Sequence, residues 1–287
     1  MLGNWIILTI FSSVFAAINR IIQKVLLNNK ENDKFALSGI FQILVSIVFL
    51  IYTLSTNSFE LPNLGSVWVS VVAMVVMYAL GNLTLFMAFR AAEASEVAII
   101  LASSSLWSIS SAAILLGEKI VGSSWIGVGL ILLGLVIINY QKTDWHLSKG
   151  HIFAILAAIL YGFAFTNDAF ILGHYSSVPS YLVIAFFLPG LATLLCRPSA
   201  IRAIPRLFSN ARSTYMIIFG SIAFALSAIA VFTAYKIGGP ASLISPITQS
   251  SIIFTIIISY FFLGERDNIL KKIFGTAAII LGVILLV

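Results

Sequence analysis

Two stretches with the same pattern determine how this sequence is interpreted: LLGEKIVGSSWIG at residues 115–127 and FLGERDNILKKIFG at residues 262–275. Each follows a long apolar run, contains Leu-Gly-Glu and a cation, and ends at a glycine within the start of another apolar run. A signal that occurs twice indicates an internal duplication, which is the first feature to look for in any sequence. The second copy carries more positive charge than the first, and that difference also needs an explanation.

The composition excludes a soluble protein. Of the 287 residues, 60% are hydrophobic and 9% are charged, whereas a typical soluble domain has about 25% charged residues. The lipid bilayer is therefore an expected partner. The net charge of +6 does not indicate a nucleic-acid partner, because the basic residues lie mostly between apolar runs and form no dense patch. The single cysteine, Cys196, has no metal or redox spacing, and we expect no cofactor and no metal.

Ten segments are long and apolar enough to cross a bilayer as helices, which takes about 20 residues each. The separators between them are short, and none is long enough to form a soluble domain. The first segment lacks the cationic start and the small-residue cleavage site of a removed signal peptide. The expected spans, counted as helices 1 to 10, are residues 4–27, 35–55, 66–89, 95–116, 121–140, 151–172, 179–196, 213–236, 241–263 and 269–287.

The basic residues are strongly biased toward alternate connections. With the adjoining helix ends included, the odd-numbered connections hold 14 of the 16 Lys and Arg residues, and the even-numbered ones hold Lys119 and Lys236. Lys and Arg concentrate in cytoplasmic loops. The bias therefore predicts that the odd connections are cytoplasmic and that both termini lie outside the cytoplasm, in a multi-pass protein of the inner (plasma) membrane.

Several matches between the halves support the duplication. AFRAAEAS at residues 88–95 resembles AYKIGGPAS at residues 234–242, and each Leu-Gly-Glu signal is followed by glycines seven residues apart, Gly127 with Gly134 and Gly275 with Gly282. Each half, residues 1–143 and residues 144–287, then holds five helices. Because five is odd, the second half must cross the membrane in the opposite sense. This 5+5 inverted-topology repeat is an architecture of secondary transporters, which bind substrate between the halves near the midplane.

Ten spans in this arrangement, with paired LGEK and LGER signals before a glycine-bearing last helix, resemble the drug/metabolite transporter superfamily, specifically its EamA-type (RhaT-like) members. The resemblance covers the whole chain, and the order of the motifs makes it specific. It implies an all-α exporter or exchanger of small metabolites, often amino acids. In that fold helices 1, 3, 4, 6, 8 and 9 would line a central cavity, helices 2 and 7 would flank it, and helices 5 and 10 would be peripheral. We expect a monomeric transport unit.

Polar and aromatic residues inside the spans are the candidates for contact with a substrate, because a buried polar group is costly in a bilayer. Tyr78 and Asn82 are one helical turn apart and share a face, as do Tyr161 and Phe165. For each candidate the alternative is ordinary packing or hydrogen bonding between helices. The expected substrate-cavity residues are Asn19, Tyr78, Asn82, Ser103, Trp107, Tyr161, Phe165, Asn167 and Gln249.

Arg20 and Asp168 are expected to serve gating or coupling. Asp168 is the only acid well inside a span, and Arg20 is its partner in the repeat. Since the two helices run in opposite directions, we expect these side chains at different depths, about 15 Å or more apart, without a salt bridge. The alternatives are a capped helix end for Asp168 and, for Arg20 with Lys24 one turn on, snorkelling to the cytoplasmic interface.

The repeated glycine spacing in helices 5 and 10 places small residues on nearly one face of each helix. Small residues allow two helix backbones to approach closely in a membrane. The sequence therefore predicts that helix 5 packs against helix 10, as a structural contact.

The sequence as a whole predicts a secondary transporter of a small-molecule substrate, not an enzyme. It would be an exporter, facilitator or exchanger of small organic metabolites such as amino acids, working by alternating access. A proton-coupled multidrug or cation exporter is the alternative: proton-coupled relatives use a glutamate in the first helix, which is missing here, but Asp168 keeps coupling open. A membrane-embedded enzyme is a remote alternative, because the histidines 146, 151 and 174 form no metal-ligand set. The glutamates of the two opening motifs are interpreted as helix-end signals, the second motif carrying more charge because it faces the cytoplasm.

Overall fold

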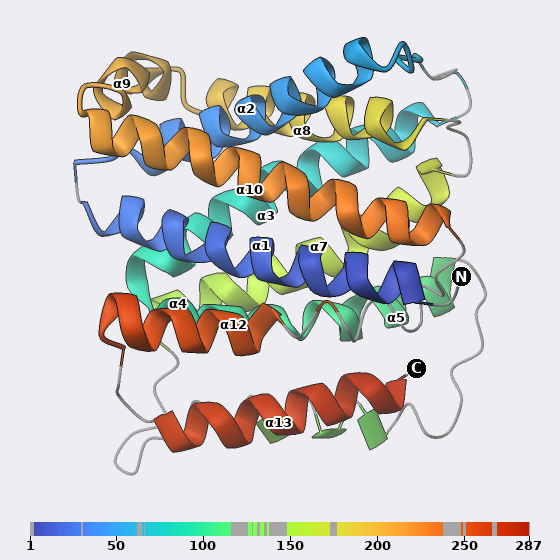
Figure 1. Ribbon diagram of the computed structural model, residues 1–287, viewed down its shortest axis with the longest axis vertical. Helices are drawn as coiled ribbons and strands as arrows, with labels where there is room; N and C mark the ends of the chain where they lie inside the picture. The colour runs from blue at the N-terminus through green and yellow to red at the C-terminus, as the bar shows by residue number, and fades with distance from the viewer. Residues whose placement is uncertain are drawn as a thin grey trace.

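The computed structural model describes residues 3–29, 31–61, 65, 67–115, 126–127, 129–130, 133–134, 137, 148–172, 177–237, 248, 251–265 and 269–286. Within these residues every regular element is helical (Figure 1). The helices are α1 (Gly3–Asn28), α2 (Lys34–Ser55), α3 (Trp68–Ala91), α4 (Ala94–Leu101), α5 (Ser104–Leu115), α7 (Lys149–Leu172), α8 (Val178–Leu195), α9 (Ser199–Leu207), α10 (Ala211–Lys236), α12 (Ser251–Ile258), the π-helical turn η2 (Ser259–Leu263) and α13 (Ile269–Leu286).

The helices have the length and surface of a membrane protein. In the described part of the chain, six of them are long and apolar enough to cross a bilayer: α1, α2, α3, α7, α8 and α10. Large apolar side chains point outward, among them Ile7 at 66%, Trp68 at 61% and Phe262 at 81% exposure. Such a surface is unstable in water and matches lipid. The chain is therefore an all-α integral membrane protein, as its composition predicts.

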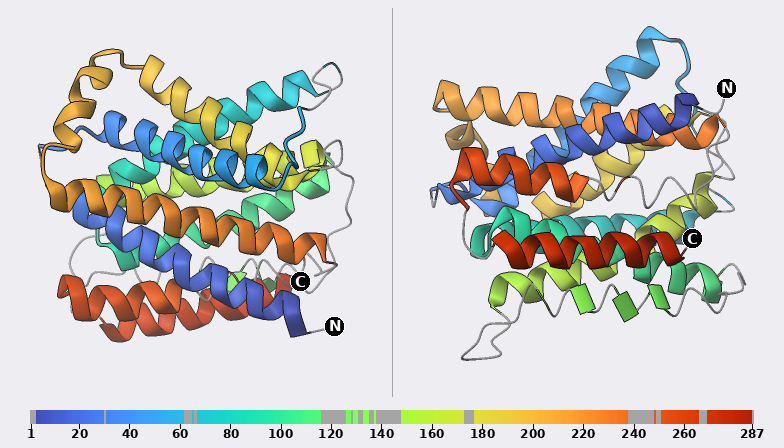
Figure 2. Two further views of the ribbon diagram at one scale, coloured as in Figure 1. Left: turned by 45° about the horizontal axis from the view of Figure 1, so that its top comes forward. Right: turned by 60° about the horizontal axis from the view of Figure 1, so that its bottom comes forward.

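The long helices pair across the two halves of the chain. Three pairs lie side by side, α1 with α10, α2 with α8, and α3 with α7 (Figures 1 and 2). The approach of α2 to α8 is close, because a Cβ on Gly39 would lie 2.5 Å from Leu194 and 3.1 Å from the carbonyl oxygen of Gly190. Exchanging the first five predicted helices with the second five maps the α1–α10 pair onto α7–α3 and the α2–α8 pair onto itself.

The contact predicted between helices 5 and 10 is confirmed at Gly134. A Cβ at this position would lie 2.6 Å from Ile279 and 2.7 Å from the carbonyl oxygen of Gly275, and both of these residues belong to α13. The glycine at this position therefore permits the two helices to pack closely, which is the usual role of small residues between membrane helices.

The odd-numbered connections meet at one end of the bundle. Arg197 after α8 pairs with Asp33 before α2 at 3.3 Å, and a Cβ on Gly150 at the start of α7 would lie 2.6 Å from Ala92 after α3. Glu265 after η2 accepts a hydrogen bond from the backbone N–H of Ala94 at 3.0 Å. The start of α1 and the end of α13 lie at the opposite end (Figure 1). This grouping is what an alternation of up and down spans requires.

Helix 4 was predicted as one span over residues 95–116, and this is wrong in detail. The segment consists of two helices, α4 and α5, with residues 102–103 between them. The Ser103 hydroxyl donates to the carbonyl oxygen of Ile100 at 2.7 Å, and the backbone bonds Ser103 to Ile100 and Leu106 to Ser103 span three residues instead of four. A serine side chain that competes for the helical carbonyls, together with such a tight turn, interrupts a helix.

The separator between helices 7 and 8 contains a short helix that the sequence analysis did not predict. In α9, Ala200 and Leu207 are buried while Arg202 and Arg206 are exposed. The segment is therefore amphipathic, and its arginines and prolines obscured its helical periodicity.

Candidate functional site

A buried carboxylate lies between three of the membrane-spanning helices. Asp168 of α7 is 4% exposed, and both of its carboxylate oxygens accept hydrogen bonds from tyrosines. Tyr78 of α3 donates to Oδ2 and Tyr181 of α8 donates to Oδ1. Neither partner is a cation. Two hydroxyl donors satisfy the carboxyl group locally, as a buried polar group requires, without cancelling the charge of its ionised form.

The hydrogen-bond chain continues from Tyr78 along α3. Asn82, one turn on, donates to the carbonyl oxygen of Tyr78 at 2.7 Å and to Gln42 Oε1 of α2 at 3.2 Å, and its Oδ1 accepts from the hydroxyl of Tyr161 at 2.9 Å. The ring centroids of Tyr78 and Tyr161 are 6.0 Å apart. We call Gln42, Tyr78, Asn82, Tyr161, Asp168 and Tyr181 the central polar cluster.

Phe165 borders this cluster. Its ring stacks on Tyr161 with the centroids 6.4 Å apart, and 49% of the residue is exposed. The structure thus brings together five of the residues chosen from the sequence: Tyr78, Asn82, Tyr161, Phe165 and Asp168.

Four other chosen residues lie outside the central polar cluster. Asn167 donates to the carbonyl oxygen of Ser70 at 2.8 Å, and the Ser103 hydroxyl serves the break between α4 and α5. Trp107 lies against α7, where a Cβ on Gly162 would be 2.4 Å from the Trp107 Cβ. Asn19 is 4% exposed, and its Oδ1 has no hydrogen-bond partner among the described residues. Gln249 lies outside the described residues.

Arg20 and Asp168 form no ion pair with each other among the described contacts. Arg20 of α1 instead donates from Nη1 to the hydroxyl of Ser251 of α12 at 3.0 Å. Lys24, one turn further along α1, donates from Nζ to the carbonyl oxygens of Phe89, at 2.7 Å, and of Ala92. These carbonyls are at the C-terminal end of α3, where a cation is electrostatically favourable.

Sequence reasoning missed two members of the cluster, Gln42 and Tyr181. The family resemblance implied that helices 2 and 7 only flank the cavity, and both missed residues belong to these helices. Gln42 is 3% exposed and Tyr181 is 1% exposed. A lone amide in the apolar span 35–55 was a signal that could have identified Gln42. Tyr181, near the start of its span, resembled an ordinary interfacial tyrosine.

A second group of charges surrounds the start of α4. Glu265 accepts from the backbone N–H groups of Ala94 at 3.0 Å and Ser95 at 3.3 Å, and from the Ser95 hydroxyl at 2.9 Å. The glutamate of the second opening motif therefore caps a helix of the other half.

An ion pair and a histidine–carboxylate contact flank this cap. Lys272 of α13, 2% exposed, pairs with Glu93, and His151 of α7 lies 3.2 Å from Glu96. Partial burial raises the pKa of the Glu93 carboxyl above its usual value, and the hydrogen bond and charge of Lys272 oppose this shift. We call Glu93, Glu96, His151, Glu265 and Lys272 the α4 cap cluster. Within the described residues no three His, Cys, Asp or Glu side chains converge as a metal site.

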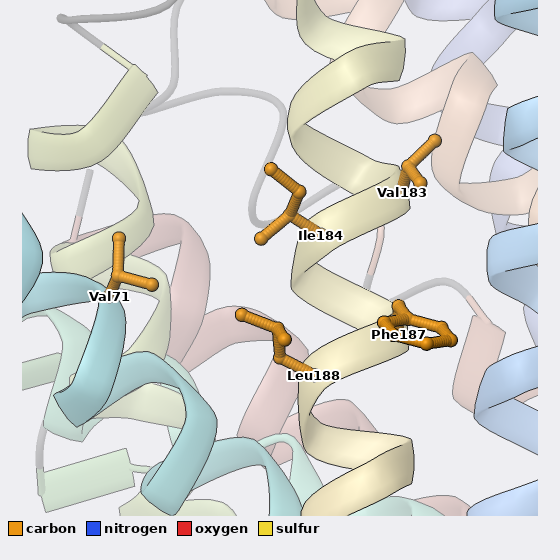
Figure 3. Close-up of a pocket in the computed structure, with 5 residues that line it drawn as sticks. All are labelled: Val71, Val183, Ile184, Phe187 and Leu188. Carbon is orange, nitrogen blue, oxygen red and sulfur yellow. The ribbon is translucent and has the colours of Figure 1, made fainter. Parts of the chain in front are cut away.

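A groove between α3 and α8 is too apolar to be the site of a polar solute. It has a volume of about 250 Å³ and is lined by Val71, Val183, Ile184, Phe187 and Leu188 (Figure 3). Phe187 is 42% exposed on the outside of the bundle, so the groove faces lipid.

Comparisons with known proteins agree with the fold described above. The model of the EamA-like transporter family matches residues 3–140 and again residues 148–287. No curated protein matches the sequence. A crystal structure of another protein superposes over 96% of this chain and 94% of its own, with a TM-score of 0.64 and 13% sequence identity. At that identity the likeness concerns the fold alone.

Proposed function

Because this chain belongs to the EamA-like transporter family, within the drug/metabolite transporter superfamily, we propose that it carries small organic metabolites such as amino acids across the membrane by alternating access. The family establishes a membrane transporter. The substrate class, the mechanism and the plasma-membrane location are our proposals, as are one chain acting as the transport unit and two inverted halves over residues 1–143 and 144–287. The symmetric pairing of α1 with α10 and of α3 with α7 supports the inverted repeat.

One observation carries the proposal: a buried carboxylate whose two hydrogen-bond donors come from different halves of the chain. Tyr78 belongs to the first half, and Asp168 and Tyr181 belong to the second. Rocking one half against the other, as alternating access requires, would separate Tyr78 from Asp168. A polar substrate that replaces the lost bonds would compensate for the separation, so solute binding and rearrangement would be coupled at this cluster.

The test is uptake into liposomes reconstituted with the purified protein. The panel contains labelled amino acids and organic cations, each measured with and without a pH gradient. We expect saturable uptake of at least one solute, reduced at least tenfold in Asp168→Asn. The matched control is Asp33→Asn, which keeps a good helix N-cap and lies outside the spans, and it should transport normally. Uptake no greater than that of protein-free liposomes for the whole panel would refute the proposal.

A second candidate function is proton-coupled export of drugs or cations. Asp168 favours it, because this carboxyl group lies inside a span and, among the described residues, its hydrogen-bond partners are neutral tyrosines. The same experiment separates the two functions. Uptake that strictly requires a pH gradient, with Asp168→Asn abolishing that requirement, indicates proton coupling, and uptake independent of the gradient indicates facilitation or exchange.

A further inference from the structure

Arg20 is a cation within a membrane-spanning helix that has no anionic partner among the described residues. Within the part of the chain that the structure describes, Nη1 donates to the neutral hydroxyl of Ser251 at 3.0 Å, and the four ion pairs found there do not include Arg20. A guanidinium carries five N–H donors, and among the described residues only one of them has a protein acceptor. An unpaired charge in a bilayer is costly and marks a functional position.

The guanidinium is partly buried, and its hydrogen-bond partner Ser251 lies well away from the ends of the bundle. Ser251 begins the stretch α12–η2, which ends at Leu263 next to the α4 cap cluster. Twelve residues of helix separate Ser251 from Leu263, about 18 Å at 1.5 Å per residue, and the hydrocarbon core is only about 30 Å thick. Arg20 therefore contacts α12 about 18 Å from the end of this stretch at the cap cluster, and it does not extend to that interface as a snorkelling side chain would.

The surroundings of Arg20 connect it to the central polar cluster. The phenol of Tyr161 lies within electrostatic range of the guanidinium, and the same hydroxyl donates to Asn82. Asp168 is seven residues further along α7, about 10 Å at the helical rise. Among the described residues the cation and the acid have separate neutral partners, Ser251 for Arg20 and the two tyrosines for Asp168.

We propose that Arg20 binds the carboxylate of the transported solute; this inference rests on the transport function proposed above and names its substrate class as monocarboxylates, including zwitterionic amino acids. The planar guanidinium presents two parallel N–H donors, which match the two oxygens of a carboxylate. Ser251 holds one nitrogen and so restricts the position of the group. Phosphate dianions are disfavoured, because the only other cation in α1, Lys24, is engaged with the carbonyls of Phe89 and Ala92.

The test compares solutes that differ only in the carboxylate. L-phenylalanine, L-phenylalaninamide and phenethylamine serve as one series, each used as a competitor of uptake into liposomes and as a ligand in thermal unfolding of the detergent-solubilised protein. We expect L-phenylalanine to compete and to stabilise at concentrations at least tenfold lower than the other two. In Arg20→Gln this preference should disappear, and Arg20→Lys should keep part of it. Arg202→Gln, which removes an exposed cation on α9, is the matched control and should behave as wild type.

The unfolding temperature without ligand distinguishes binding from a structural role. Arg20→Gln removes a charge whose burial costs free energy in the folded protein. The variant should therefore unfold at the same temperature as wild type or at a higher one. A lower unfolding temperature with an unchanged carboxylate preference would overturn the proposal. Wild-type uptake that treats the three solutes alike would also overturn it while leaving the transport function standing. Carboxylate-specific stabilisation without uptake of any solute would refute transport and leave the Arg20 site intact.

Discussion

Glu265→Gln tests whether the second Leu-Gly-Glu motif holds the start of α4 in place. The carboxylate accepts hydrogen bonds from Ala94 N, Ser95 N and Ser95 Oγ at 3.0, 3.3 and 2.9 Å, and a negative charge is favourable at a helix N-terminus. Glutamine has nearly the same shape, but it has no charge and only one acceptor oxygen. Hydrogen bonds to charged groups contribute about 1.5–3 kcal/mol each. For a half-buried side chain that keeps one acceptor, we expect a loss of about 2 kcal/mol.

The assay is thermal unfolding in detergent followed by tryptophan fluorescence. A loss of this size lowers the unfolding temperature by about 4–8 °C, at about 2–4 °C per kcal/mol. Glu31→Gln is the matched control, because Glu31 pairs with Arg206 at the same end of the molecule through side chains that are 68% and 66% exposed. Such a surface pair contributes about 0–1 kcal/mol. If Glu265→Gln unfolds within a degree of Glu31→Gln, the cap does not stabilise α4 and the reasoning fails.

Further predictions concern the neighbouring ion pair and the glycine contact. Lys272→Met leaves the partly buried Glu93 carboxylate without a cation, which should cost about 2 kcal/mol at neutral pH. Because the pKa of Glu93 is raised in the folded protein, the folded protein takes up a proton at a higher pH than the unfolded chain does, and the stability deficit should shrink as the pH falls through that pKa. Adding Glu93→Gln to Lys272→Met should remove most of the deficit. A deficit that does not change with pH would contradict the assignment. Gly134→Ala places a Cβ 2.6 Å from Ile279, so unfolding should require about 1–3 kcal/mol less. Gly129→Ala, where a Cβ meets nothing within 4 Å, should be neutral or stabilising, and equal effects of the two substitutions would argue against the contact.

The sequence predicted the membrane class and the main helices because lipid imposes them. A chain with few charges must bury its apolar surface in a bilayer, and the bilayer sets the length of each span. The glycine spacing predicted the packing at Gly134 for the same reason, since only small residues permit such an approach. The break after α4 was not predictable in this way, because it lies at an alanine and a serine, Ala102 and Ser103, and both residue types are also found inside continuous helices. The break depends on which carbonyl the Ser103 hydroxyl binds.

In the candidate site, too, the sequence predicted some features and not others. Helical periodicity gave the shared face of Tyr78 and Asn82, but it could not say which residue of another helix would meet that face. Gln42 and Tyr181 come from helices that are distant in sequence, so their hydrogen bonds to the cluster depend on tertiary packing alone. The functional roles of the chosen residues remain predictions, and the liposome experiments address them directly.

The opening motif acquires a more specific meaning from these contacts. Its glutamate was interpreted as a signal for the end of its own helix, yet Glu265 caps α4, and His151 and Lys272 pair with two further glutamates beside that cap. The start of α4 belongs to the first half of the chain, while all three of its partners belong to the second half. If the halves rock during transport, either these contacts break or α4 moves with the second half. Lys272 is 2% exposed, and separating a buried ion pair is costly. The break between α4 and α5 provides a place where α4 can pivot without the rest of the first half, so we expect the cap cluster to stay intact and the Tyr78–Asp168 bond to be the one that opens.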